Sequence, residues 1–151
     1  MIFLDNNSTT PVDSRVQKVI ADSVGQNFGN PHSLFHKTGI NASSALSKAR
    51  KNIAEFFGVE NEYVVFNSGA TEANNQFIIG SALKALSEES DRKKIFCSSV
   101  EHKCVLNAAD YLQSLGFEKY EIPVDKKGQV SLEYLRQNLD ENTLLVSVMA
   151  V

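Results

Sequence analysis

From residue 63 onward, the sequence alternates short apolar runs with longer stretches in which apolar residues recur every three or four positions. The short runs are typical of buried strands, and the longer stretches are typical of amphipathic helices. Strands separated by helices favour a mostly parallel sheet with helices on both faces, a three-layer α/β/α fold. We expect strands at residues 63–66, 94–97, 120–124 and 144–149, and helices at about 71–86, 105–115 and 132–139.

The region before residue 63 predicts helices and a loop. A short extended start precedes a helix at about residues 14–24, whose valines and isoleucine share one face. A loop rich in Gly, Asn and His follows at residues 25–39. A second helix is expected over residues 42–56, with Gly58 ending it.

Composition excludes several classes of function. The 151 residues are 42% hydrophobic and 22% charged, with a formal net charge of −3, which is ordinary for a soluble protein. Slight acidity argues against a nucleic-acid binder, which needs clustered Lys and Arg. No apolar run reaches the roughly 20 residues of a membrane span, and the start does not resemble a signal peptide. Cys97 and Cys104 lack CxxC spacing, so we expect a reducing, cytoplasmic location.

The last predicted strand runs directly into Met149, Ala150 and Val151, with no turn residue or helix after it. A buried parallel strand normally feeds a loop at its carboxyl edge, where ligands bind in such sheets. This pattern favours a chain that continues beyond residue 151 over a complete small domain.

A small-residue turn, Ser68-Gly69-Ala70-Thr71, lies between a predicted strand and a predicted helix. Such residues let the backbone approach an anion, and the N–H groups and dipole of the helix start favour negative charge. Thr71 adds a hydroxyl donor. The turn lacks the lysine of a P-loop and the GxGxxG spacing, so neither nucleotide motif is supported. A turn that merely caps the helix remains an equal alternative.

Glu101-His102-Lys103 follows the strand that ends at Cys97. This position is also at the carboxyl edge of the predicted sheet. A histidine there could stack on a flat aromatic ligand or move protons near neutral pH. From these three residues alone, a capping or surface histidine is the more common outcome.

Taken together, the segments resemble the cysteine desulfurases of the class V aminotransferase group, which have the type I fold of pyridoxal-phosphate (PLP) enzymes. The matching segments follow the family's order along the whole chain. They are LDNNSTTP (4–11), GNPHS (29–33), NSGATEANN (67–75), SVEHK (99–103), VD (124–125) with Gly128, and TLLVSVM (143–149).

The resemblance implies roles for individual residues. Ala70 and Thr71 match the positions that hold the cofactor phosphate, and His102 matches the histidine that stacks on the pyridine ring and assists proton transfer. His36 matches a loop histidine near the active site or dimer interface, although a purely structural hydrogen bond is as common. Residues 5–10, which include Asn7, match a segment near the substrate entrance.

The resemblance also implies a reaction and its partners. Cysteine desulfurases use pyridoxal 5'-phosphate to convert L-cysteine to L-alanine, leaving a persulfide on an enzyme cysteine. The sulfur passes to scaffold proteins for iron–sulfur clusters or to tRNA-thiolation carriers, and enzymes of this group are homodimers. No membrane partner or direct nucleic-acid partner is expected.

Departures from the family pattern limit this expectation. The family chain is more than twice as long, and three of its residues have no match here: the acidic partner of the pyridine nitrogen, the Schiff-base lysine and the persulfide cysteine. Lys103 belongs to the ring-stacking motif, and small buried thiols are the default interpretation of Cys97 and Cys104. We therefore expect an extended segment at residues 1–13 and a partial PLP-binding large domain at 14–151, without the carboxyl-terminal half or the small domain. The chain alone is expected to be inactive.

Two alternatives stay open. One is another class V enzyme, such as a selenocysteine lyase or an aminotransferase. The other is a noncatalytic partner domain that has half of the fold, which predicts a well-folded chain without a cofactor.

Overall fold

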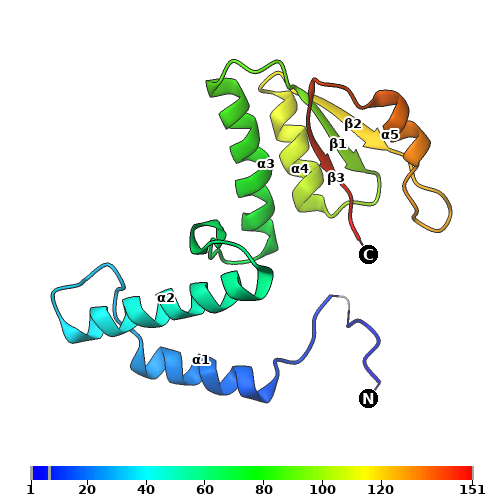
Figure 1. Cartoon of the computed structure of the whole chain (residues 1–151). Coiled ribbons are helices and arrows are strands. Elements are labelled where there is room, and N and C mark those ends of the chain that lie inside the picture. The colour runs from blue at the N-terminus through cyan, green and yellow to red at the C-terminus, as the bar shows by residue number, and fades with distance from the viewer. Residues whose placement is uncertain (1, 7, 151) are drawn as a thin grey trace. The chain divides into compact units, whose positions relative to one another are not determined.

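The computed structural model describes residues 2–6 and 8–150, so Met1, Asn7 and Val151 lie outside the described residues. Its backbone divides into two compact units, Met1–Val65 and Phe66–Val151. Each unit is described separately below (Figure 1). The predicted division into residues 1–13 and 14–151 stays a prediction.

The first unit contains two long helices and a short 3₁₀ helix. Helix α1 spans Ser14–Gln26, and the Asp13 carboxylate caps it by accepting from the N–H of Arg15 at 2.8 Å. Helix α2 spans Lys37–Phe57 and ends at Gly58, which adopts the left-handed conformation at φ 66° as the sequence predicted. The 3₁₀ helix η1 spans Asn61–Tyr63.

The predicted strand at residues 63–66 is wrong. Tyr63 ends η1, and the following residues join no ladder in the described part of the chain. A strand needs backbone partners on a neighbouring strand. Here the carbonyl oxygen of Val64 instead accepts a hydrogen bond from Nε of Arg50 at 3.1 Å, and Val65 is more than half exposed.

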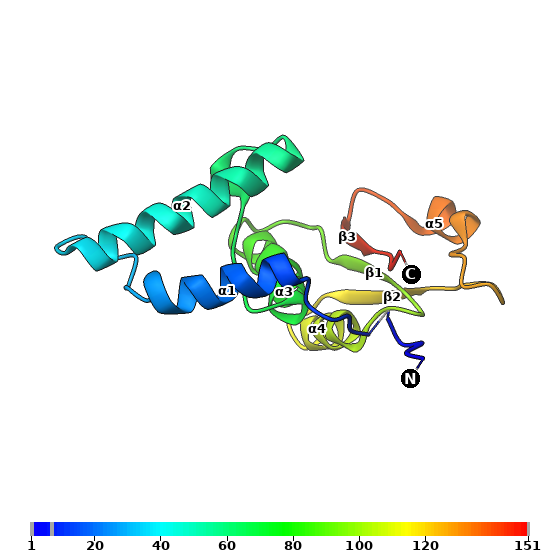
Figure 2. The ribbon, with the colours of Figure 1, turned by 90° about the horizontal axis from the view of Figure 1, so that it is seen from below.

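The second unit is a parallel sheet with helices on both faces (Figure 2). The strands are β1 (Lys94–Ser98), β2 (Glu118–Ile122) and β3 (Thr143–Ser147), in the order β2-β1-β3. Phe96 of β1 pairs with Tyr120 of β2 and with Val146 of β3. The helices are α3 (Ala70–Ser87), α4 (Lys103–Gln113) and α5 (Leu132–Asn138), close to their predicted positions. These elements confirm the predicted α/β class.

Successive side chains of β1 point to opposite faces of the sheet. Ile95 and Cys97 are fully buried against α3 and α4. Phe96 points to the other face, where it stacks on Tyr120 with ring centroids 4.9 Å apart and meets the edge of Tyr134 from α5. The main core therefore lies between the sheet and the α3–α4 pair. Its buried members are Ile78, Ala82, Ile95, Cys97, Val105, Ala108, Ala109, Leu112 and Phe117.

No helix among the described residues is long and apolar enough to cross a membrane.

Candidate functional site

The first turn of α3 is open at its amino end. Its N-cap is Gly69, and no side chain caps it. Gly69 has φ +154°, a conformation that residues with a Cβ rarely adopt, so glycine is needed here. The first N–H groups of a helix have no partner within that helix and can bind an anion. The start of α3 therefore lacks the side-chain cap that the alternative interpretation of this turn expected.

Glu72 holds the preceding chain in place. Its Oε2 accepts hydrogen bonds from the hydroxyl of Ser68 at 2.6 Å and from the N–H of Ser68 at 2.8 Å. The hydroxyl bond, followed by the backbone bond, lowers the pKa of Glu72. The hydroxyl and the backbone N–H of Ser68 therefore both donate to Glu72. The donors expected to face an anion are the first-turn N–H groups and the Thr71 hydroxyl, and both Ala70 and Thr71 are exposed.

His102 is the N-cap of α4. Its Nδ1 accepts from the N–H of Cys104 at 3.2 Å, and the side chain is exposed at the carboxyl end of β1. The capping interpretation is therefore confirmed, although it does not exclude a second role for the outer part of the ring. Because Nδ1 accepts, the neutral ring carries its proton on Nε2.

Cys104 connects the starts of α3 and α4. Its Sγ lies 3.0 Å from Nδ1 of His102 and 3.2 Å from Nδ2 of Asn74, a residue in the second turn of α3. Cys104 also lines a hollow of about 430 Å³ between these helices, together with Thr71. Its other lining residues are Asn75, Ile79, Asn107, Ala108 and Tyr111. The structure therefore brings Thr71 and His102 to the same end of the α3–α4 pair through Cys104, although no hydrogen bond joins their two side chains.

Glu101 fixes the segment before His102 to the sheet. Its Oε1 accepts a hydrogen bond at 3.0 Å from the hydroxyl of Ser147, the last residue of β3. This contact, like those of Asn74 and Cys104, was not predicted from the sequence. The only signal in the sequence was that Asn74 lies in the NSGATEANN segment and Glu101 in the SVEHK segment. Cys104 directly follows the SVEHK segment.

The two cysteines differ in how deeply they are buried. Cys97 is fully buried in β1, and burial raises the pKa of its thiol to about 11. Cys104 is only partly buried. The expectation of a small buried thiol is confirmed for Cys97 and is only partly correct for Cys104.

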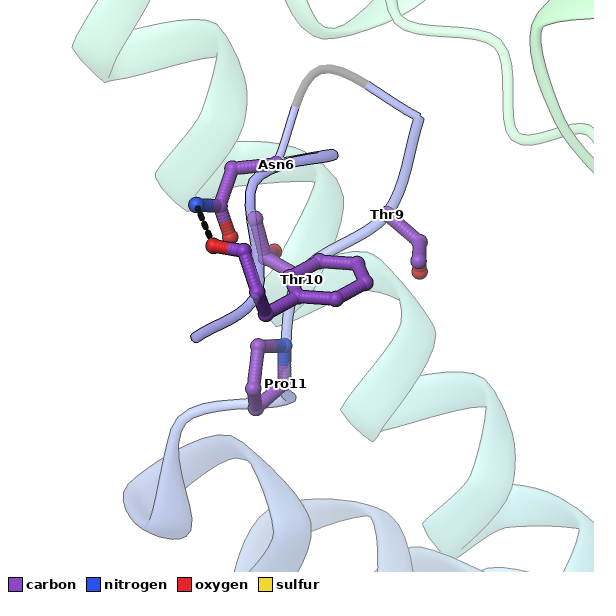
Figure 3. Close-up of a pocket in the computed structure, with 5 residues that line it drawn as sticks. Asn6, Thr9, Thr10 and Pro11 are labelled. Atoms are coloured by element: carbon purple, nitrogen blue, oxygen red, sulfur yellow. Dashed lines mark hydrogen bonds between the residues drawn. The ribbon is translucent and has the colours of Figure 1, made fainter. Parts of the chain in front are cut away.

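The remaining predicted residues lie in the first unit. His36 is the N-cap of α2, and its Nδ1 accepts from the N–H of Gly39 at 3.0 Å, which is the structural role considered for it. Near the start of the chain, an open hollow of about 470 Å³ is lined by Phe3, Asn6, Thr9, Thr10 and Pro11 (Figure 3). There the Asn6 amide donates to the carbonyl oxygen of Phe3 at 3.5 Å. Asn7 lies outside the described residues.

Fold and site together define an α/β protein whose candidate functional side chains lie at helix starts, near the carboxyl edge of a parallel sheet. The sequence profile of the class-V aminotransferases matches residues 2–151. The chain belongs to the class-V aminotransferase family.

Its relatives include cysteine desulfurases. The chain is 41% identical over 152 residues to cysteine desulfurase IscS of Rickettsia typhi, and 42% identical over 148 residues to cysteine desulfurase IscS 1 of Archaeoglobus fulgidus. These alignments cover 99% and 98% of the chain but only 36% and 38% of the relatives.

Solved structures share the fold. A NifS-like protein superposes with a TM-score of 0.87 at 38% identity, over 97% of this chain and 39% of its own. The structure of SspA in complex with cysteine gives a TM-score of 0.83 at 33% identity, over 95% of this chain and 40% of its own. The chain thus spans about two fifths of each of these structures.

Proposed function

We propose that this chain is the amino-terminal part of a PLP-dependent cysteine desulfurase. The whole protein would convert L-cysteine to L-alanine and pass persulfide sulfur to acceptor proteins for iron–sulfur cluster assembly or tRNA thiolation. It would act in the cytoplasm as a homodimer. The IscS relatives and the SspA–cysteine complex support the substrate class.

The observation that carries the proposal is the contact between the starts of α3 and α4 through Cys104. The residues present fit the cofactor. The uncapped start of α3, with Ala70 and the Thr71 hydroxyl, suits a phosphate, and the exposed ring of His102 suits a flat aromatic partner. When bound, PLP supplies an electron sink for chemistry beside the substrate amine.

In this proposal, each residue has a limited task. The N–H groups of the first turn of α3 and the Thr71 hydroxyl would hold the phosphate. His102 would hold the pyridine ring by stacking and would carry a proton at Nε2 for exchange with substrate. Gly69 and the Ser68–Glu72 hydrogen bonds keep the turn in the shape that exposes these donors.

The test uses the intact protein that contains this chain. Thr71→Val removes one hydroxyl donor to a charged group and is expected to weaken PLP binding about tenfold, measured by equilibrium dialysis. Thr143→Val is the matched control, because Thr143 is the first residue of β3 and lies at the amino ends of the strands, away from the candidate site. If both variants bind PLP like the unchanged protein, the phosphate role of Thr71 is refuted.

Turnover tests the assignment itself. The intact protein is expected to release alanine from L-cysteine, and to release the persulfide sulfur as sulfide when a thiol reductant such as dithiothreitol is added; His102→Ala is expected to lose most of this activity. A preference for selenocysteine, or transamination without sulfide release, would instead support another class V activity. The 151-residue chain alone is expected to give no turnover above a PLP-only background.

A further inference from the structure

The thiol of Cys104 has two polar neighbours that come from different parts of the sequence. Nδ2 of Asn74 lies 3.2 Å from Sγ, and Nδ1 of His102 lies 3.0 Å from it. The N–H of Cys104 also donates to Nδ1 of His102, at 3.2 Å. The histidine ring therefore has two contacts with one residue, and that residue is held in turn by α3.

The chemistry of the three groups sets the direction of the hydrogen bonds. An asparagine side-chain nitrogen only donates, so Sγ accepts from Asn74. Nδ1 of His102 already accepts from the backbone N–H of Cys104, so it acts as an acceptor toward the thiol as well. The chain of donors runs from the Asn74 amide to the thiol and from the thiol to the imidazole, which places the proton of the neutral ring on Nε2.

His36 shows what a capping histidine looks like without such a thiol. It also caps a helix through Nδ1, which accepts from the N–H of Gly39 at 3.0 Å. Capping alone therefore needs only the backbone contact. The thiol and amide at His102 are additional, and they link its ring to the helix whose start bears Ala70 and Thr71.

We propose that Asn74 and Cys104 are positioning residues for His102. The Asn74 amide orients the thiol of Cys104, and the thiol fixes the rotation of the imidazole ring relative to the start of α3, while the backbone N–H of Cys104 sets the Nε2–H tautomer. This inference rests on the proposed function, because a fixed ring matters for catalysis only if His102 stacks on PLP and carries a proton.

The first measurement does not depend on activity. In the intact protein without cofactor, ¹⁵N NMR of the ring nitrogens is expected to show His102 as a single Nε2–H tautomer. Cys104→Ala keeps the backbone cap and therefore the Nε2–H tautomer, but NMR relaxation of the ring C–H groups is expected to show a lower order parameter for the His102 ring. Cys104→Ser, which retains a hydroxyl donor, is expected to restore most of that order. The His36 signals serve as the internal control and are expected to stay unchanged in both variants.

Asn74→Leu tests the outer contact. It keeps a similar volume but removes the amide donor, so it is expected to lower the order parameter of the His102 ring by less than Cys104→Ala does. In the PLP-loaded protein, Cys104→Ala is expected to reduce kcat for L-cysteine about tenfold, with KM within about twofold and partial rescue by Cys104→Ser.

The outcomes separate the two proposals. A Cys104→Ala protein whose His102 ring keeps the order parameter of the unchanged protein overturns the positioning inference, whatever its activity. A more mobile ring in a protein that never desulfurates cysteine would support the positioning contact and refute the proposed function. Loss of stability with no change at the ring would assign Cys104 a purely structural role and also overturn the inference.

Discussion

At the scale of single residues, the polar contacts that matter most are those the sequence did not indicate. Ala70, Thr71 and His102 could be selected because they fall in a recognisable turn and motif. The link through Cys104 depends on a contact between residues 30 positions apart, Asn74 and Cys104. Spacing along a chain cannot reveal such a pair, because it forms only when α3 and α4 pack together.

The two cysteines are expected to differ in reactivity. A thiol pKa of about 11, in place of the ordinary 9.0, reduces the thiolate fraction of Cys97 at neutral pH about a hundredfold. Full burial in β1 blocks access as well. Iodoacetamide labelling at pH 7.5, followed by peptide mass spectrometry, is expected to modify Cys104 long before Cys97. Equal labelling of both residues would contradict the buried position of Cys97.

Burial of Cys97 also makes the free energy of unfolding depend on pH in the alkaline range. Because its pKa is raised in the folded state, the neutral thiol favours folding below about pH 9, and this contribution is lost as pH rises toward 11. The free energy of unfolding is therefore expected to fall between these values in urea titrations. Cys97→Ala is the control and is expected to show a shallower fall, since it has no thiol to ionise.

At the scale of elements, periodicity predicted the five α-helices of the described residues within a few residues, and three of the four strands that we expected are present. The failure at residues 63–66 has a physical cause. An apolar run indicates burial or β-propensity, but a strand exists only where a neighbouring backbone pairs with it. Sequence also could not reveal which strand is central, since the order β2-β1-β3 is a property of the assembled sheet.

Helix α3 offers a matched pair of glycine substitutions. Gly69 precedes the helix at φ +154°, whereas Gly80 lies within it, and an added Cβ meets nothing within 4 Å at either position. Gly69→Ala is expected to destabilise the protein by about 1–3 kcal/mol through backbone strain alone. Gly80→Ala is expected to stabilise it by about 0.5–1 kcal/mol. Urea unfolding of both variants tests this, and equal effects would contradict the strain at Gly69.

At the scale of the whole molecule, the two units differ in how much they bury. The second unit encloses a continuous core, while α1 in the first unit has no buried residue at all. Val19 and Val24 on its apolar face are 63% and 73% exposed. An exposed apolar face of this kind favours association.

The 151-residue chain is therefore expected to self-associate, as judged by size-exclusion chromatography with light scattering. Val19→Glu is expected to shift the chain toward monomer because it places a charge on the exposed apolar face of α1. Gly25→Glu adds the same charge on the opposite side of that helix, where an added Cβ meets nothing within 4 Å, and is expected to have little effect. A monodisperse monomer of the unchanged chain would instead favour the noncatalytic partner domain.

The strand order has a consequence during synthesis. β1 is the central strand, yet its two neighbours are made at different times: β2 ends at Ile122, and β3 is complete only at Ser147. On the ribosome, one edge of β1 therefore stays without its native partner while the residues after β2 are translated. Unpaired strand edges attract other chains, so this interval is when nascent copies on the same messenger RNA are most prone to pair with one another.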